Sequence, residues 1–119
     1  MKHAQSDLEL AKLGRKSKMV MNEQICFHSQ QCAEKAVKAV LLFKEIDFPL
    51  THDLEELLDI LENSGIKLIS MLTEAGKLTP YAVETRYPGY WGDLTNEDAD
   101  ESIELAEKIL KWASKYILS

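Results

Sequence analysis

The chain has 119 residues, of which 20 are acidic and 14 basic, so its formal net charge is −6. This length is sufficient for one hydrophobic core, and we expect a single domain over residues 1–119. Binding along a nucleic-acid backbone depends on lysine and arginine, so an acidic chain is not expected to bind long nucleic acid.

The acidic residues are concentrated in two segments. Residues 46–65 contain six acids and residues 93–107 contain seven, whereas residues 1–18 carry five basic and two acidic side chains. Much of this pattern matches helix ends, because acids stabilise the first turn of a helix and bases the last. The net charge is therefore compatible with a small local anion site or an electropositive partner.

The N-terminal residues lack the apolar stretch of a signal peptide, and no run of eighteen apolar residues occurs. We therefore expect a cytoplasmic protein without a membrane contact. Cys26 and Cys32 lie six positions apart in one predicted helix, which places their Cα atoms about 9 Å apart and out of disulfide reach. Reduced cysteines fit a cytosolic compartment.

Apolar residues recur at spacings of three, four and seven, which is typical of amphipathic helices, and no segment shows strand alternation. The first helix is predicted over about residues 4–18, with Leu10 on its inner face and a basic end at residues 15–18. The second, at about residues 22–45, is the longest and carries an apolar stripe that includes Phe43. One polar strip follows it: Gln24, His28, Gln31, Lys35 and Lys38.

The third helix is predicted to begin at a capping box. Asp53 can accept hydrogen bonds from the first turn, and Glu56 stands three residues later, as a capping box requires. The run Asn63-Ser64-Gly65 ends this helix. A fourth helical stretch is expected over residues 66–75, and Pro80 begins a short accessory turn.

A rigid aromatic loop is expected at residues 87–94, before the last helix. That helix is predicted to begin at Thr95 or Asn96 and to end near Ile117, with an acidic start and a basic end. Together these elements predict an all-α fold, an up-and-down antiparallel bundle of four main helices plus a short accessory helix.

Few residues are arranged as known chemistry requires. Cys26, His28 and Cys32 are close in sequence, but a structural zinc site needs four ligands, and we interpret the cysteines as small core residues. No glycine-rich phosphate loop and no oriented Cys–His pair occurs. We therefore expect no metal, no cofactor and no catalytic residue.

The polar strip of the second helix has two interpretations. It is either a solvated face, with an ion pair between Glu34 and Lys38, or a surface that binds an anion or a partner. Arg86 likewise either fixes its own loop or holds a phosphate. The aromatic residues that follow it either cover the end of the bundle or stack on a base or a partner chain.

Three segments together resemble the HEPN domain family. The second helix contains Gln30-Gln31-Cys32-Ala33-Glu34-Lys35-Ala36-Val37-Lys38, similar to the family pattern Gln-Gln-x-x-Glu-Lys-x-x-Lys. The segment Thr51-His52-Asp53-Leu54 and then Tyr81 with Arg86-Tyr87-Pro88 follow in the family's order. The resemblance spans about residues 4–118, which is almost the whole chain.

The resemblance implies a helical bundle that is commonly a homodimer and is often encoded beside a minimal nucleotidyltransferase. Some members bind nucleotides, and others are metal-independent ribonucleases that carry a histidine four to six residues after an arginine. No histidine follows His52 here, so the ribonuclease motif is absent after Arg86 and also after Arg15. General acid–base cleavage near neutral pH commonly uses an imidazole, so a role other than catalysis is favoured.

The sequence therefore predicts a HEPN-like nucleotide- or partner-binding module, the non-catalytic companion of a separate minimal nucleotidyltransferase in a toxin–antitoxin-like pair. Two alternatives stay open: a metal-independent ribonuclease that uses a relocated histidine, His28 or His52, and a purely structural module for dimerisation or assembly. The residues expected to bind the nucleotide or partner are Lys35, Lys38, His52, Tyr81, Arg86 and Tyr87.

Overall fold

The computed structural model describes residues 1–67, 74, 78 and 94–118. This part of the chain forms four helices and no strand: α1 (Lys2–Arg15), α2 (Asn22–Phe43), α3 (Leu54–Asn63) and α5 (Asn96–Leu118). The predicted all-α bundle is confirmed. Within the described residues, no helix is both long enough and apolar enough to span a membrane.

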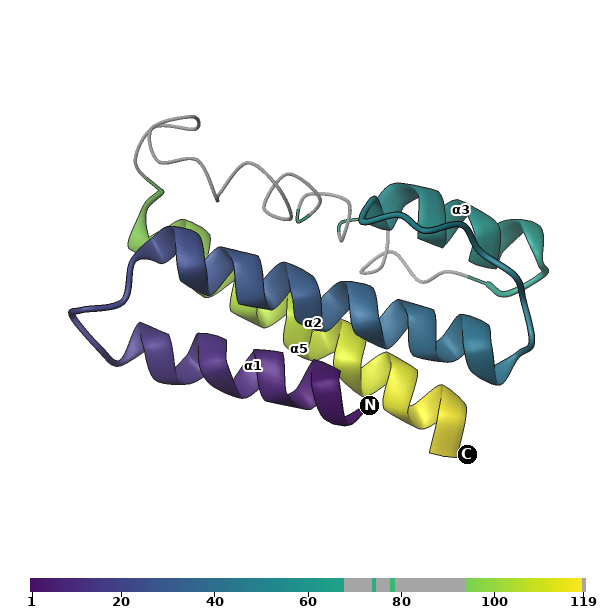
Figure 1. The fold of residues 1–119 in the computed structure, drawn as a ribbon, viewed down its shortest axis with the longest axis horizontal. Coiled ribbons are helices and arrows are strands. Elements are labelled where there is room, and N and C mark those ends of the chain that lie inside the picture. Colours follow the sequence, from purple (N-terminus) through teal and green to yellow (C-terminus); the bar gives the residue numbers. More distant parts are fainter. Residues whose placement is uncertain (68–73, 75–77, 79–93, 119) are drawn as a thin grey trace.

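Helix α2 occupies the centre of the bundle and packs against the three other helices (Figure 1). Asn22, at the start of α2, contacts Asn96, at the start of α5. Further along both helices, Cys32 of α2 contacts Ala106 of α5, so the two helices run in the same direction. Helix α1 runs antiparallel to both. Its end is joined to α5 by an ion pair between Lys12 and Glu107.

Small side chains allow the three long helices to approach closely, and leucines fill the space beneath α3. The four inward leucines of α3 have the predicted helical spacing, and burying such side chains is the main stabilising term in a bundle of this size. The fully buried residues of the main core include Ala33, Ala36, Val37, Val40, Leu41, Leu54, Leu57, Leu61, Ala106, Ile109 and Ala113.

The predicted cap of α3 is present, but the predicted capping box is not completed. Asp53 Oδ1 accepts hydrogen bonds from the backbone N–H groups of Glu55 (3.0 Å) and Glu56 (3.4 Å) at the start of α3. The Glu56 carboxylate, however, bonds to the Thr51 hydroxyl at 3.0 Å rather than to the capping residue. At α5, the reciprocal pattern forms between Thr95 and Asp98, each side chain accepting from the other's backbone N–H.

Helix α2 ends at Phe43, two residues before the predicted end. Glu45 adopts a left-handed conformation (φ 57°), and the Ile46 N–H donates to the Leu41 carbonyl at 2.9 Å, which closes the helix with a Schellman-type turn. This turn reverses the chain. Residues 44–53 then run back beside α2, so that α3 begins near the middle of α2 (Figure 1).

Several sequence predictions are corrected at the helix ends. Leu10 and Phe43 were expected inside, but they are 49% and 51% exposed, respectively. Helix α1 ends at Arg15, three residues before its predicted end, and this leaves residues 16–18 in the turn. The predicted stretch 66–75 lies mostly outside the described residues, and Ile66 and Lys67 are not helical. The accessory turn from Pro80 and nearly all of the aromatic loop also lie outside them.

Candidate functional site

The polar strip of α2 is built on two nearly buried carboxylates. Asp7 of α1 is 7% exposed and Glu34 of α2 is 3% exposed. Taking an ionised carboxylate out of water is costly unless cations and hydrogen-bond donors compensate for the lost hydration. Each of these two carboxylates binds one histidine and one lysine, so the strip is an ordered network rather than a row of independent side chains.

The first network, the Asp7 cluster, consists of Asp7, His28 and Lys35. One Asp7 oxygen lies 3.0 Å from His28 Nδ1 and the other lies 2.6 Å from Lys35 Nζ. Both partners are about one-third exposed, so their outer atoms reach solvent. The Asp7 cluster therefore joins α1 to α2 and fixes two nitrogen groups at the surface.

The second network, the Glu34 cluster, consists of Glu34, Gln30, Lys38 and His52. Glu34 Oε1 accepts from His52 Nδ1 at 2.8 Å and from Gln30 Nε2 at 3.2 Å, and Oε2 accepts from Lys38 Nζ at 3.2 Å. Gln30 also donates to the His52 carbonyl at 3.3 Å. The reversed segment 44–53 thus brings His52 to the middle of α2, where Glu34 holds its ring.

Lys38 and His52 are held differently within the Glu34 cluster. Lys38 Nζ also lies 6.0 Å from the centre of the Phe48 ring, within cation–π range, so two contacts restrict it. The His52 side chain is 60% exposed. An ionised carboxylate only accepts hydrogen bonds, so Nδ1 of His52 is the donor in this contact.

The charges within the two clusters balance. Each contains one carboxylate and one ammonium group, so each is neutral when its histidine is neutral. This local balance contrasts with the acidic total of the chain and keeps cationic groups fixed on the α2 surface.

Three of the six sequence-predicted site residues lie in these clusters. Lys38 and His52 share Glu34, whereas Lys35 belongs to the Asp7 cluster. The ion pair expected between Glu34 and Lys38 is present. Tyr81, Arg86 and Tyr87 lie outside the described residues.

Asp7 and Gln30 are candidate functional-site residues that were not predicted from the sequence. Asp7 stands three residues after Ala4 and four before Ala11, on the inward stripe of α1, so its spacing marked it as a buried carboxylate. Gln30 is fully buried, and its carbonyl oxygen accepts from Gln31 at 2.7 Å. A signal for its role lies in the family-like pattern itself, because Gln30, Glu34 and Lys38 recur every four residues on one helical face.

The two cysteines are core residues, as the sequence predicted. Both are free and buried. Burial raises the pKa of the Cys26 thiol to about 11 and that of Cys32 to about 12. Both thiols are therefore protonated near neutral pH and are poor nucleophiles. Within the described residues, no group of three or more His, Cys, Asp or Glu side chains is arranged to hold a metal ion.

Comparison with known families decides what kind of domain carries these clusters. A model of the HEPN domain matches residues 1–116. The chain belongs to the HEPN domain family. The resemblance predicted from the three motif segments is therefore confirmed, and two of those segments meet in the Glu34 cluster of this HEPN domain.

Two HEPN relatives cover most of the chain. The Methanocaldococcus jannaschii protein named "Putative toxin MJ1304" is 34% identical over 124 residues, which cover 92% of this chain and 80% of the relative. The crystal structure of ST0689, an archaeal HEPN homologue, superposes with a TM-score of 0.76 at 35% identity. That alignment covers 98% of this chain and 93% of the other.

Proposed function

We propose that this HEPN protein binds the phosphates of a nucleotide, free or carried by a protein partner, through the polar face of α2. In this proposal it is the non-catalytic member of a toxin–antitoxin-type pair with a separate nucleotidyltransferase. The similarity to a relative whose name contains the word toxin supports the pairing. The observation that carries the binding role is the pair of carboxylate-anchored clusters at the α2 surface.

The geometry supports phosphate binding because the donors are preorganised. Asp7 fixes the Lys35 ammonium, and Glu34 fixes both the Lys38 ammonium and the His52 ring, so little side-chain entropy is lost when a ligand arrives. Tyr81, Arg86 and Tyr87 complete this proposed site: the guanidinium grips a phosphate and a tyrosine stacks on the base.

Calorimetry with ATP, GTP and a short RNA tests this proposal. We expect Lys35→Gln/Lys38→Gln and Arg86→Ala each to weaken nucleotide binding about tenfold or more, since each removes a charge-assisted contact. Glutamine keeps a donor beside each buried carboxylate and so limits the loss of stability. The matched control is Lys108→Gln/Lys111→Gln on α5. These two lysines are also three positions apart and each also forms an ion pair with a carboxylate, so their removal is expected to leave the affinity unchanged.

Two results would count against the α2 face. The first is the absence of any heat of binding with wild-type protein and all three ligands. The second is an equal loss of affinity in the α5 control, because this would show that only the total charge matters.

A second function, metal-independent RNA cleavage, is favoured by one specific observation. His52 and His28 each bond through Nδ1 to a nearly buried carboxylate, which orients the ring for proton transfer at Nε2. In this reaction one imidazole removes the proton of a ribose 2′-hydroxyl, and the oxygen attacks the adjacent phosphorus. The bond between phosphorus and the 5′-oxygen then breaks, the protonated imidazole returns its proton to that oxygen, and a 2′,3′-cyclic phosphate forms, while a lysine ammonium stabilises the phosphorane charge.

Incubation of a short RNA with the protein in EDTA tests this second function. If it holds, the products carry 2′,3′-cyclic phosphate ends, and His28→Ala/His52→Ala reduces the rate at least about a hundredfold, as expected for the loss of a general base. His3→Ala, which removes an exposed histidine of α1, is the control and should retain full activity. Undiminished cleavage by the double variant would exclude this mechanism.

A further inference from the structure

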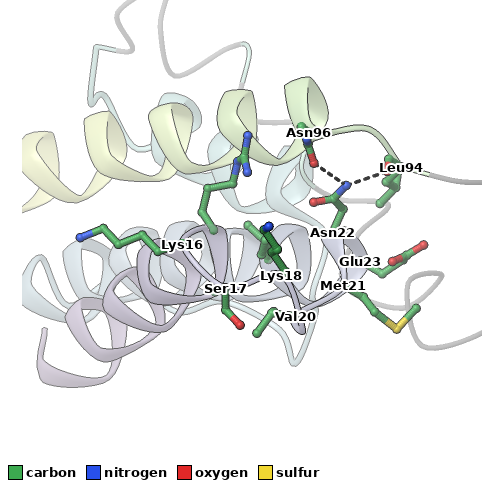
Figure 2. Close-up of a pocket in the computed structure, with 12 residues that line it drawn as sticks. Lys16, Ser17, Lys18, Val20, Met21, Asn22, Glu23, Leu94 and Asn96 are labelled. Atoms are coloured by element: carbon green, nitrogen blue, oxygen red, sulfur yellow. Dashed lines mark hydrogen bonds between the residues drawn. The ribbon is translucent and has the colours of Figure 1, made fainter.

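A cavity of about 660 Å³ lies at the end of the bundle where α1 turns into α2 (Figure 2). Its walls come from the last residues of α1, the connecting turn, the first residues of α2, and the entry to α5 at Leu94 and Asn96. The volume is within the range of small-molecule sites in proteins. No member of the Asp7 or Glu34 cluster lines it.

The mouth of this cavity is basic. Arg15, Lys16 and Lys18 line it, and among the lining residues that the structure describes, Glu23 is the one acidic side chain. Lys16 and Lys18 are exposed, and within the described residues neither forms an ion pair. These cations were expected to complete the last turn of α1. Because α1 ends at Arg15, they project from the turn instead.

The walls of the cavity are held in place by the hydrogen bonds of Asn22 on one side and by packing against Gly14 on the other. The Asn22 side-chain amide donates to the Leu94 carbonyl at 2.9 Å and to Asn96 Oδ1 at 3.2 Å, which joins the start of α2 to the entry of α5 (Figure 2). On the other side, the turn packs directly onto Gly14. A Cβ atom at Gly14 would lie 2.9 Å from Val20 Cγ1, so glycine permits this close approach.

The start of α2 adds donors for an anion. The N–H groups of Asn22 and Glu23 are in the first turn, where they have no acceptor within the helix, and both residues line the cavity. Met21 precedes the helix without a side-chain hydrogen bond to it. Val20, Ile25 and Leu94 add apolar atoms to the lining beside these polar groups.

We infer that this cavity is a second anion site, which takes a phosphorylated small molecule of nucleotide size with its phosphates at Lys16 and Lys18. The apolar side chains of the lining receive the non-phosphate part of the ligand. The proposal is independent of the α2 face. Arg15 is held by Asp100 through bonds of 2.6 and 3.2 Å, so Asp100 competes with the ligand for this guanidinium.

Titration of the full chain with ATP, inorganic pyrophosphate and adenosine tests the site. We expect ATP to bind more tightly than pyrophosphate, and adenosine alone to bind weakly. Lys16→Ser/Lys18→Ser should weaken ATP binding about tenfold, as the loss of two charged contacts implies. Both lysines are exposed in a turn, so the fold is retained. Lys108→Ser/Lys111→Ser is the charge-matched control, with an expected change below about twofold.

Asp100→Asn provides a gain-of-binding test, because it releases Arg15 toward the cavity. We expect it to tighten ATP binding several-fold, a result that damage to the fold does not produce. Amide NMR shifts on ATP addition should include the cavity residues Ser17, Asn22, Glu23 and Asn96, whether or not residues of the Glu34 cluster also shift. Shifts confined to the Glu34 cluster would overturn this inference and support the α2 face instead. No binding by wild-type protein, or equal loss in the control, would also overturn it.

Discussion

Replacing Glu34 with alanine is expected to destabilise the protein by about 2–3 kcal/mol, measured by urea unfolding. The carboxylate is 3% exposed and holds Gln30, Lys38 and His52 at once. Among the described residues, its removal leaves the buried Gln30 amide with the His52 carbonyl as its one acceptor. Lys38 and His52 regain water, which keeps the cost below that of a fully enclosed ion pair.

Glu104→Ala is the matched control for this substitution. Glu104 forms an i,i+4 ion pair with Lys108 at 3.0 Å, the same spacing as Glu34 with Lys38, but its side chain is 67% exposed. Exposed pairs contribute little, so we expect a change of at most about 0.5 kcal/mol. Equal effects at the two positions would contradict the structural importance of the Glu34 cluster.

The second readout is which helix of the Glu34→Ala variant loses protection from amide hydrogen exchange. Because Glu34 joins α2 to the segment just before α3, its loss should accelerate amide hydrogen exchange in α3 more than in α5. Uniform acceleration across both helices would mean that Glu34 contributes to the whole bundle rather than to the docking of α3.

The helices were predictable because their apolar stripes and their capping residues depend on residues that are close together in the sequence. The leucine spacing of α3 and the capping role of Asp53 depend on residues within a few positions of one another, and both are confirmed. The ends were less predictable. The backbone of Glu45 adopts a conformation that is costly for a residue with a side chain, and the sequence contains no glycine there to indicate it.

The site was only partly predictable because its contacts are between distant segments. Helical spacing placed Lys35 and Lys38 on one face, but it did not show that they bind different carboxylates. Asp7 reaches Lys35 across 28 positions, and His52 reaches Glu34 only because the chain reverses after α2. Similarly, Lys16 and Lys18 became cavity residues because α1 ended early.

Leu57→Ala is expected to cost about 3 kcal/mol of unfolding free energy, because it opens a cavity beneath α3. Leu57 is fully buried on the stripe that packs α3 against the core. For a domain whose total stability is about 5–15 kcal/mol, such a loss is measurable as a clear shift of the urea midpoint. Leu50→Ala is the control, since Leu50 is fully exposed, and it should change stability by at most about 0.5 kcal/mol.

The double variant Glu34→Ala/Leu57→Ala tests whether both residues stabilise the same helix. Glu34 fixes the chain at His52, just before α3, and Leu57 fixes α3 itself, so either change alone loosens the docking that the other supports. We therefore expect the double variant to lose less than the sum of the single losses, by more than about 0.5 kcal/mol. If the double variant is unfolded, Glu34→Gln takes the place of Glu34→Ala in the cycle. Strict additivity would mean that the polar and apolar contacts stabilise separate parts of the bundle.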